Sequence, residues 1–190
     1  MLTATVNTYY VVKSIHNMTV LITFGVAFIY PIAFAVAIRN DPRSLPALHR
    51  LEATIERKLI VPGLLVVILT GIDITSIAHH WGQFFVQWGF SAAVLIGALV
   101  IAVMIPSAER AAALAERDLA AGAVGAVSAA NTAGAAGAVS TTGSGTVATA
   151  GAISLSSEYR ALARRLLVLG TFLSGLVLIT VLFMAVGFNP

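Results

Sequence analysis

Four long apolar stretches, separated by three more polar segments, form the main pattern of this chain. The apolar stretches cover residues 9–38, 59–78, 84–105 and 166–188. Each reaches the length of about 20 residues that an α-helix needs to cross the hydrocarbon core of a bilayer. The pattern predicts an all-α fold, a bundle of four transmembrane helices that forms a single membrane domain over residues 1–190.

The first span is the longest and contains a proline. Tyr9 and Tyr10 stand at its start, where aromatic rings favour the membrane interface. Pro31 lies late in the span, so its missing N–H and its ring predict a kink. A secretory signal peptide is the alternative interpretation, since Lys13 is basic and Ala35–Ala37 resembles a cleavage site. The apolar run exceeds the roughly 7 to 15 residues of such a signal, which favours a retained helix.

The polar segment after the first span predicts a short helix on the membrane surface. Pro46 suits the first turn of that helix. Apolar residues then recur at steps of three and four, at Leu48, Leu51, Ile55 and Leu59. This spacing predicts an interfacial amphipathic helix in loop one, with one apolar face toward the membrane. His49 lies in the same segment, and we expect its side chain to be solvated.

A tract of low complexity precedes the last span. Residues 119–157 contain no charged side chain and consist mainly of Gly, Ala, Ser, Thr and Val. Such a tract has too few bulky side chains to offset the entropy lost on ordering, so it predicts a flexible loop within the membrane domain. An extra membrane helix around residues 120–139 is the alternative, which the Gly, Ser, Thr and Asn content disfavours.

Composition agrees with membrane residence and excludes several functional classes. Of the 190 residues, 58% are apolar and only 10% are charged, against about 25% charged in soluble domains. The net charge of +3 comes from two basic clusters between apolar spans rather than from one basic face, so no nucleic-acid binding is expected. Without cysteine there is no thiolate metal site or cysteine nucleophile. No nucleotide loop or hydrolase motif is present, which favours a non-enzymatic protein.

Basic residues predict the orientation of the bundle. They lie in loops one and three, at Arg39, Arg43, Arg50, Arg57 and Lys58 and at Arg110, Arg117, Arg160, Arg164 and Arg165. Cytoplasmic loops carry an excess of Lys and Arg. We therefore expect loops one and three in the cytoplasm and both termini outside, with the lipid bilayer as the main partner.

Three ionisable residues fall inside the predicted spans. They are Lys13, His16 and Asp73. A charge near the bilayer centre costs at least about 2.5 to 3.5 kcal/mol, so such residues normally face the bundle interior or a water-filled pocket. Counted from the predicted outer boundary, the three lie at similar depth in the outer leaflet. We predict a buried polar cluster in which Lys13 or His16 faces Asp73.

A cofactor site is the sharper interpretation of the same histidine. His16 is a candidate axial ligand for haem, and His79 or His80 at the outer end of the second span is a candidate second ligand. Spans three and four contain no histidine, so such a site would lie near the outer rim. The pair His79 and His80 is otherwise interpreted as an exposed linker. Copper is disfavoured because cysteine is absent and the methionines form no cluster.

Three segments resemble a bacterial family of predicted integral membrane proteins of unknown function, and the resemblance covers nearly the whole chain. They are Lys13–Phe28, Val61–Ile74 and Ser157–Gly170. Its first helix begins with a Lys-x-x-His pattern, matched by Lys13 and His16. Its second helix carries Pro-Gly-Leu and then Thr-Gly, matched by Pro62, Gly63, Leu64, Thr70 and Gly71.

That family is distantly similar to two four-helix groups, the copper-resistance D type and the membrane protoporphyrinogen oxidase type. The similarity implies haem b at His16 alone, and the long insertion in loop three departs from the pattern. We therefore expect a non-enzymatic component of the bacterial cytoplasmic membrane. A haem-binding redox protein and a small-solute or metal transport component are the alternatives. Small-residue surfaces would allow a homo-oligomer or a partner in a membrane complex; they are at Gly97, Gly170, Gly175 and Gly187.

Overall fold

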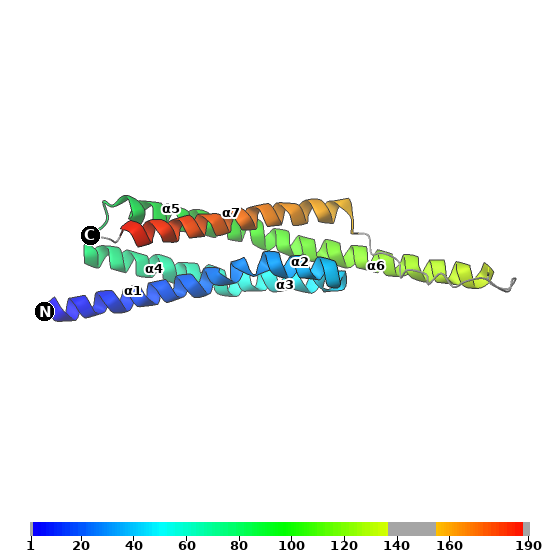
Figure 1. The fold of residues 1–190 in the computed structure, drawn as a ribbon, viewed down its shortest axis with the longest axis horizontal. Coiled ribbons are helices and arrows are strands. Elements are labelled where there is room, and N and C mark those ends of the chain that lie inside the picture. The colour runs from blue at the N-terminus through cyan, green and yellow to red at the C-terminus, as the bar shows by residue number, and fades with distance from the viewer. Residues whose placement is uncertain (1, 137–154, 188–190) are drawn as a thin grey trace.

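A computed structural model describes residues 2–136 and 155–187, which form four helical columns (Figure 1). The first column contains α1 (Leu2–Gly25), the short 3-10 helix η1 (Val26–Phe28) and α2 (Tyr30–Asn40). The second contains η2 (Pro42–Ser44), α3 (Leu45–Ile55), the π-helical turn η3 (Glu56–Ile60) and α4 (Val61–Ala78). The third contains α5 (Phe84–Leu99), the π-helical turn η4 (Val100–Met104) and α6 (Ile105–Ala136), and the fourth is α7 (Ser157–Gly187).

Each column contains a stretch long and apolar enough to cross a membrane. These stretches are Thr8–Asn40, Pro42–Ala78, Phe84–Gly122 and Ser157–Val186. Over the described residues the predicted all-α fold with four long apolar helices is thereby confirmed, and by helix length and hydropathy the chain is a multi-pass membrane protein. Figure 1 shows that α1 begins, α4 meets α5 and α7 ends at the same end of the bundle.

Prolines interrupt the columns in two different ways. The first column breaks at η1, and α2 then begins next to Pro31, where a missing N–H does least harm. In the second and third columns, η3 precedes Pro62 and η4 precedes Pro106. Each proline would crowd the carbonyl four residues earlier in a regular α-helix, and the wider π turn accommodates it. These two columns therefore continue past their prolines.

No interfacial helix is shown in loop one. Instead, α3 runs through η3 into α4 and packs along α6. The contact is close because both helices present small side chains, with Ala53 of α3 and Ala108, Ala111 and Ala115 of α6 buried. Small residues let helix backbones approach, which stabilises the pair without a membrane surface.

The third column reaches into the low-complexity tract. We predicted a loop from residue 119, but α6 remains helical to Ala136. Alanine has the highest intrinsic helix propensity, which explains how the Ala-rich start of the tract extends the preceding helix. Residues 137–154 of the predicted loop lie outside the described residues.

The start of α7 is tied to α6 by polar contacts. The Ser156 hydroxyl accepts a hydrogen bond from the N–H of Tyr159 at 3.2 Å, as an N-cap residue does. The N–H of Ser156 donates to Oδ2 of Asp118 in α6 at 2.8 Å. These contacts fix where the fourth column begins.

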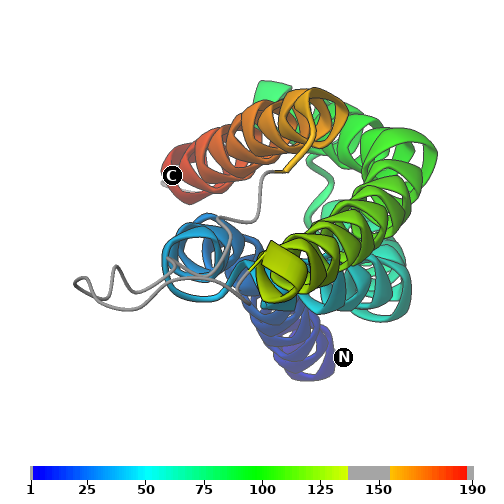
Figure 2. The same ribbon diagram turned by 90° about the vertical axis from the view of Figure 1, so that its right-hand side faces the viewer.

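Seen end-on, the columns form an open arc (Figure 2). Within the arc α1 packs on α4, α3 on α6, and α7 on α5 and α6. The first and fourth columns stand at its two ends. The apolar core lies inside the arc and includes Phe24, Leu64, Ile96 and Leu173.

Candidate functional site

Two cavities large enough for a small molecule lie between the columns, and residues of the first and fourth columns line both. The larger, which we call the His16 cavity, has a volume of about 580 Å³ and lies between α1, α4, α5 and α7. Its wall is mainly apolar, and its polar members include Lys13, His16, Asn17 and Thr75. Small-molecule sites have this character: roughly 300 to 1,000 Å³, apolar, with a few polar groups.

His16 is held in a defined orientation by the second column. Its side chain is 7% exposed, and its Nδ1 lies 2.9 Å from Oγ1 of Thr70. The Thr70 hydroxyl donates its one hydrogen to the carbonyl oxygen of Val66 at 2.7 Å. Oγ1 therefore accepts from Nδ1–H of His16, and the neutral ring carries its lone pair on Nε2.

The His16 ring packs beside Gly71 of α4. A Cβ added at Gly71 would stand 3.5 Å from Cε1 of His16, an ordinary van der Waals contact, so the ring does not require glycine there. Of the Thr-Gly pair noted in the sequence, Thr70 is the residue that holds the His16 ring, through its hydroxyl.

The other residues predicted for this region occupy different surroundings. Lys13 lines the His16 cavity, and its Nζ lies 5.7 Å from the centre of the Tyr9 ring. Asp73 has an exposed side chain on α4, and its ion pair with Lys13 or His16 stays a prediction. His79 ends α4 in a left-handed conformation, with φ of 56°, and is exposed. His80 packs edge-on against Phe85; neither histidine lines the His16 cavity.

No known protein family, curated protein or solved structure matches this chain. The resemblance of its three segments to a membrane protein family therefore stays a prediction. The function has to be argued from the geometry of the cavities.

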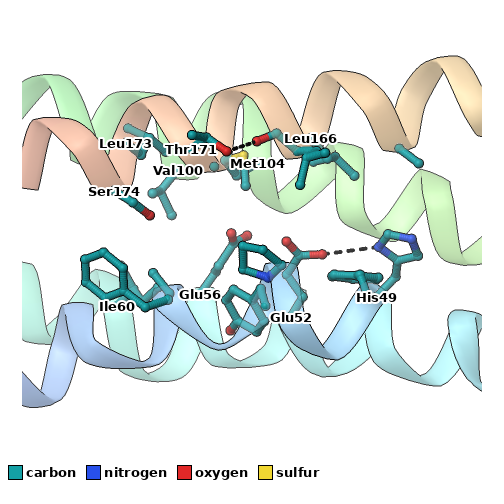
Figure 3. A pocket seen from close by; sticks show the side chains of 18 of the residues that line it. His49, Glu52, Glu56, Ile60, Val100, Met104, Leu166, Thr171, Leu173 and Ser174 are labelled. Carbon is teal, nitrogen blue, oxygen red and sulfur yellow. Dashed lines mark hydrogen bonds and ion pairs between the residues drawn. The ribbon is translucent and has the colours of Figure 1, made fainter. Parts of the chain in front are cut away.

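The second cavity, which we call the Glu56 cavity, has a volume of about 330 Å³. It lies between α2, the α3–η3 segment, η4 and α7 (Figure 3). Most of its lining is apolar, but a group of titratable side chains shares it: Tyr30, His49, Glu52, Glu56, Tyr159 and Arg164. Loop one was not expected to contribute a buried site.

His49 links α3 to α7 inside this cavity. It is 2% exposed, its Nδ1 lies 3.2 Å from Oε2 of Glu52, and its Nε2 lies 3.1 Å from the hydroxyl of Tyr159. Its ring also stacks at a tilt on Phe34 at 4.4 Å. The prediction that His49 is solvated is wrong, because α3 turns this polar face inward and leaves Leu51 exposed.

The signal for this site was present in the spacing of the polar residues. His49, Glu52 and Glu56 follow one another at steps of three and four, which places them on one face of a helix. Only the contact of α3 with α6 and α7 shows that this face is buried. Among residues 2–136 and 155–187, no three His, Cys, Asp or Glu side chains are placed to hold a metal ion.

The Glu56 cavity lies where the columns carry exposed ion pairs. Arg57 pairs with Glu109 at 2.7 Å, Arg110 with Glu158 at 3.0 Å, and all four side chains are exposed. Exposed charges of this kind are costly in hydrocarbon, so this part of the columns extends beyond the bilayer core. Glu56 precedes the predicted span 59–78, so it belongs to the part of the columns that lies outside the bilayer core.

Glu56 is buried, and its carboxyl group lacks part of the hydrogen bonding that would offset the cost of burial. It is 2% exposed, and its Oε2 has no hydrogen-bond partner among the described residues; the hydroxyl of Tyr30 is likewise buried and unpartnered. Burial, with a further contribution from the charge of Glu52, raises the pKa of Glu56 to about 8. Burial and Glu52 also raise the pKa of Tyr159 to about 12. The cavity therefore favours a proton or another positive group at Glu56.

Proposed function

We propose that this chain is a non-enzymatic membrane component that binds a small, mainly apolar ligand in the His16 cavity. The observation that carries the proposal is the buried His16, whose Nδ1 is held by Thr70 while its ring lines an apolar cavity of about 580 Å³. A histidine held in one tautomer offers Nε2 to a hydrogen-bond donor or a metal centre of the ligand. The apolar wall provides most of the contact area.

The position of the cavity suggests how a ligand enters. Residues of α1 and α7 line it, including Leu21, Leu178 and Val181, and these two helices stand at the ends of the arc (Figure 2). All three side chains are exposed, as expected for the lipid-facing part of a membrane helix. A ligand dissolved in the bilayer can therefore enter sideways between α1 and α7.

Extraction of the purified protein tests this proposal. The full chain is isolated in detergent from its membrane, and organic extracts are compared by mass spectrometry with those of His16→Leu and Ala93→Phe. Both variants should lose the co-purifying compound, the first by removing the polar contact and the second by filling the cavity. Ile15→Ala, at an exposed position next to His16 in α1 that does not line the cavity, is the matched control and should retain it. Equal extracts from all four proteins would refute a ligand held in this cavity.

A haem cofactor is the second candidate, and a specific feature of His16 favours it. Metal-binding histidines usually donate their other ring N–H to a fixed acceptor, which sets the tautomer. Nδ1–H of His16 donates in this way to Thr70. Haem b held by His16 would give the protein a redox function. His79 and His80, the candidate second ligands from the sequence, do not line this cavity, so His16 is the residue of the three that would hold the group.

Visible spectra separate this candidate from the first. The protein is expressed with sufficient haem, and spectra are recorded before and after addition of dithionite. A haem band that shifts on reduction and is lost in His16→Ala would favour the cofactor. A colourless wild-type protein would exclude haem and leave the apolar ligand.

A further inference from the structure

The Glu56 cavity contains a carboxyl group that forms no ion pair within the part of the chain that the structure describes. Glu52 and Glu56 are 4% and 2% exposed, and Figure 3 shows the Glu56 carboxyl group pointing across the cavity toward α7. Within residues 2–136 and 155–187, one of its oxygens has no hydrogen-bond partner. Burying a charge or an unpaired polar oxygen costs several kcal/mol by rough estimate, so such an atom indicates a missing partner.

The side chains around Glu56 do not neutralise it. Tyr30 faces it from α2, Glu52 and His49 from α3, and Tyr159 and Arg164 from α7, while η4 contributes the apolar Val100 and Met104. His49 already contacts Glu52 and Tyr159. Arg164 is exposed, and among the described residues no ion pair includes Glu56. The balance of charge at the cavity wall favours a positive ligand.

The rest of the lining indicates which kind of cation fits. Aromatic rings contribute to the wall, from Phe24, Phe28, Tyr30, Phe34 and Tyr159, and most other members are aliphatic. Ring faces attract cations, and aromatic cages are a common means of binding quaternary ammonium groups. The described residues offer no group of three metal ligands, so a metal ion does not fit this wall.

We propose that the Glu56 cavity binds a lipophilic organic cation, with the Glu56 carboxylate as its counter-charge and the surrounding rings as its apolar contact. This site shares neither His16 nor Thr70 with the ligand site proposed above, so each proposal can fail without the other. The cation reaches it from the gap between α2 and α7, whose residues Ile38 and Leu167 line the cavity and are exposed.

Binding should exchange a proton for the cation. In the empty cavity burial keeps Glu56 protonated, because it raises the pKa of this group to about 8. A cation is stabilised only by the ionised carboxylate, so its arrival releases about one proton. Affinity should therefore rise with pH up to about 8 and then level off.

Calorimetric titration of the full chain tests the proposal. The probe is benzyltrimethylammonium, a quaternary cation with an apolar body, and the protein is kept in a nonionic detergent that carries no ammonium group. Neopentylbenzene, in which carbon replaces nitrogen, is the neutral comparison. We expect the cation to bind more tightly than the neutral compound, and its affinity to fall by about tenfold or more in Glu56→Gln. Glu109→Gln removes an exposed carboxylate and should leave the affinity unchanged.

Several results would overturn the proposal. They are no binding of the cation to the wild type, equal binding of cation and neutral compound, an equal loss in the two variants, and an affinity independent of pH. If Glu56→Gln does not fold, the wild-type protein alone still tests the proposal. The two measurements are then the affinity for the cation compared with the neutral compound, and the pH dependence of cation affinity.

Discussion

Glu56 is the residue whose surroundings have the clearest consequence for stability. The carboxyl group of Glu56 holds its proton more tightly in the folded protein than in the unfolded chain, because burial raises the pKa of Glu56 from the ordinary 4.5 to about 8. A group with a raised pKa contributes its full stabilisation below the ordinary pKa and loses it as pH rises through the folded pKa. The protein should therefore become less stable at alkaline pH.

Thermal unfolding in detergent checks this expectation. Between about pH 5 and about pH 9 the unfolding temperature of the wild type should fall. Glu56→Gln should flatten this dependence, because the amide keeps the shape of the neutral acid and cannot ionise. A wild-type unfolding temperature that rises over the same range would contradict the assigned protonation of Glu56.

Thr70 is the residue that links stability to the His16 cavity. Thr70→Val keeps the shape of the side chain and removes the acceptor for Nδ1–H of His16. Loss of one such hydrogen bond should cost about 0.5 to 1.5 kcal/mol. The ring should also lose its fixed orientation, so co-purified ligand should decrease while the protein still folds. Unchanged ligand content would show that Thr70 does not position His16.

At the scale of the elements, close contact between α1 and α4 depends on Gly63. A Cβ added there would overlap Oγ1 of Thr23 and lie 3.1 Å from its Cβ, and Thr23 is 1% exposed. Gly63→Ala should therefore force the helices apart and destabilise the protein by about 1 to 3 kcal/mol. Gly175→Ala is the matched control, because nothing stands within 4 Å of its added Cβ.

Unfolding of the two alanine variants in detergent measures the difference. Gly63→Ala should unfold at lower temperature than the wild type, and Gly175→Ala should not. Adding Thr23→Ala to Gly63→Ala should recover part of the loss, because two of the three crowding atoms then disappear. Equal stability of Gly63→Ala and the wild type would contradict the close packing of α1 on α4.

The elements also show which features a sequence can reveal. The four spans are predictable because membrane crossing depends on length and apolar composition alone. The burial of His49 is not, because it depends on which neighbour α3 meets, and the pattern of Leu48, Leu51 and Ile55 indicated a surface. The break before Pro31 was predictable from the proline alone. The π turns before Pro62 and Pro106 were not, because a π turn is expected only if the helix continues past its proline, and the sequence does not show this.

The His16 site was predicted only in part, because the sequence shows which residue is polar but not which residues pack against it. A histidine within an apolar span has to be buried or paired, which identifies His16 from the sequence alone. Its partner Thr70 is 54 residues away, and only the packing of α1 on α4 brings the two together. The sequence therefore indicated the residue but not its environment.

At the scale of the whole molecule, the columns predict how the chain sits in the membrane. The exposed ion pairs of η3, α6 and α7 and the basic loops lie toward one end of the bundle, and α1 begins and α7 ends at the other (Figure 1). Because basic loops are retained in the cytoplasm, both termini should be outside. An alkaline phosphatase fused to the carboxyl terminus should be active, and a green fluorescent protein at the same place should be dark. The reverse pattern would overturn this orientation.

The open arc is the feature of the whole molecule on which both proposed ligand sites depend. Both are lined by Phe24 and Val177, so they adjoin at the middle of the bundle. The larger lies beside the buried His16 and the smaller beside the exposed ion pairs. The proposed entry of ligands from the lipid depends on this arrangement.

Native mass spectrometry tests the central claim, a ligand held at His16, most directly. The intact wild-type protein is released from detergent micelles and its mass is compared with the mass calculated from the sequence. We expect one bound small molecule per chain, lost in His16→Leu and retained in Ile15→Ala, whose position is exposed and outside the cavity. A wild-type protein that carries only the mass of its own chain, under conditions that preserve bound lipid on control membrane proteins, would contradict the account.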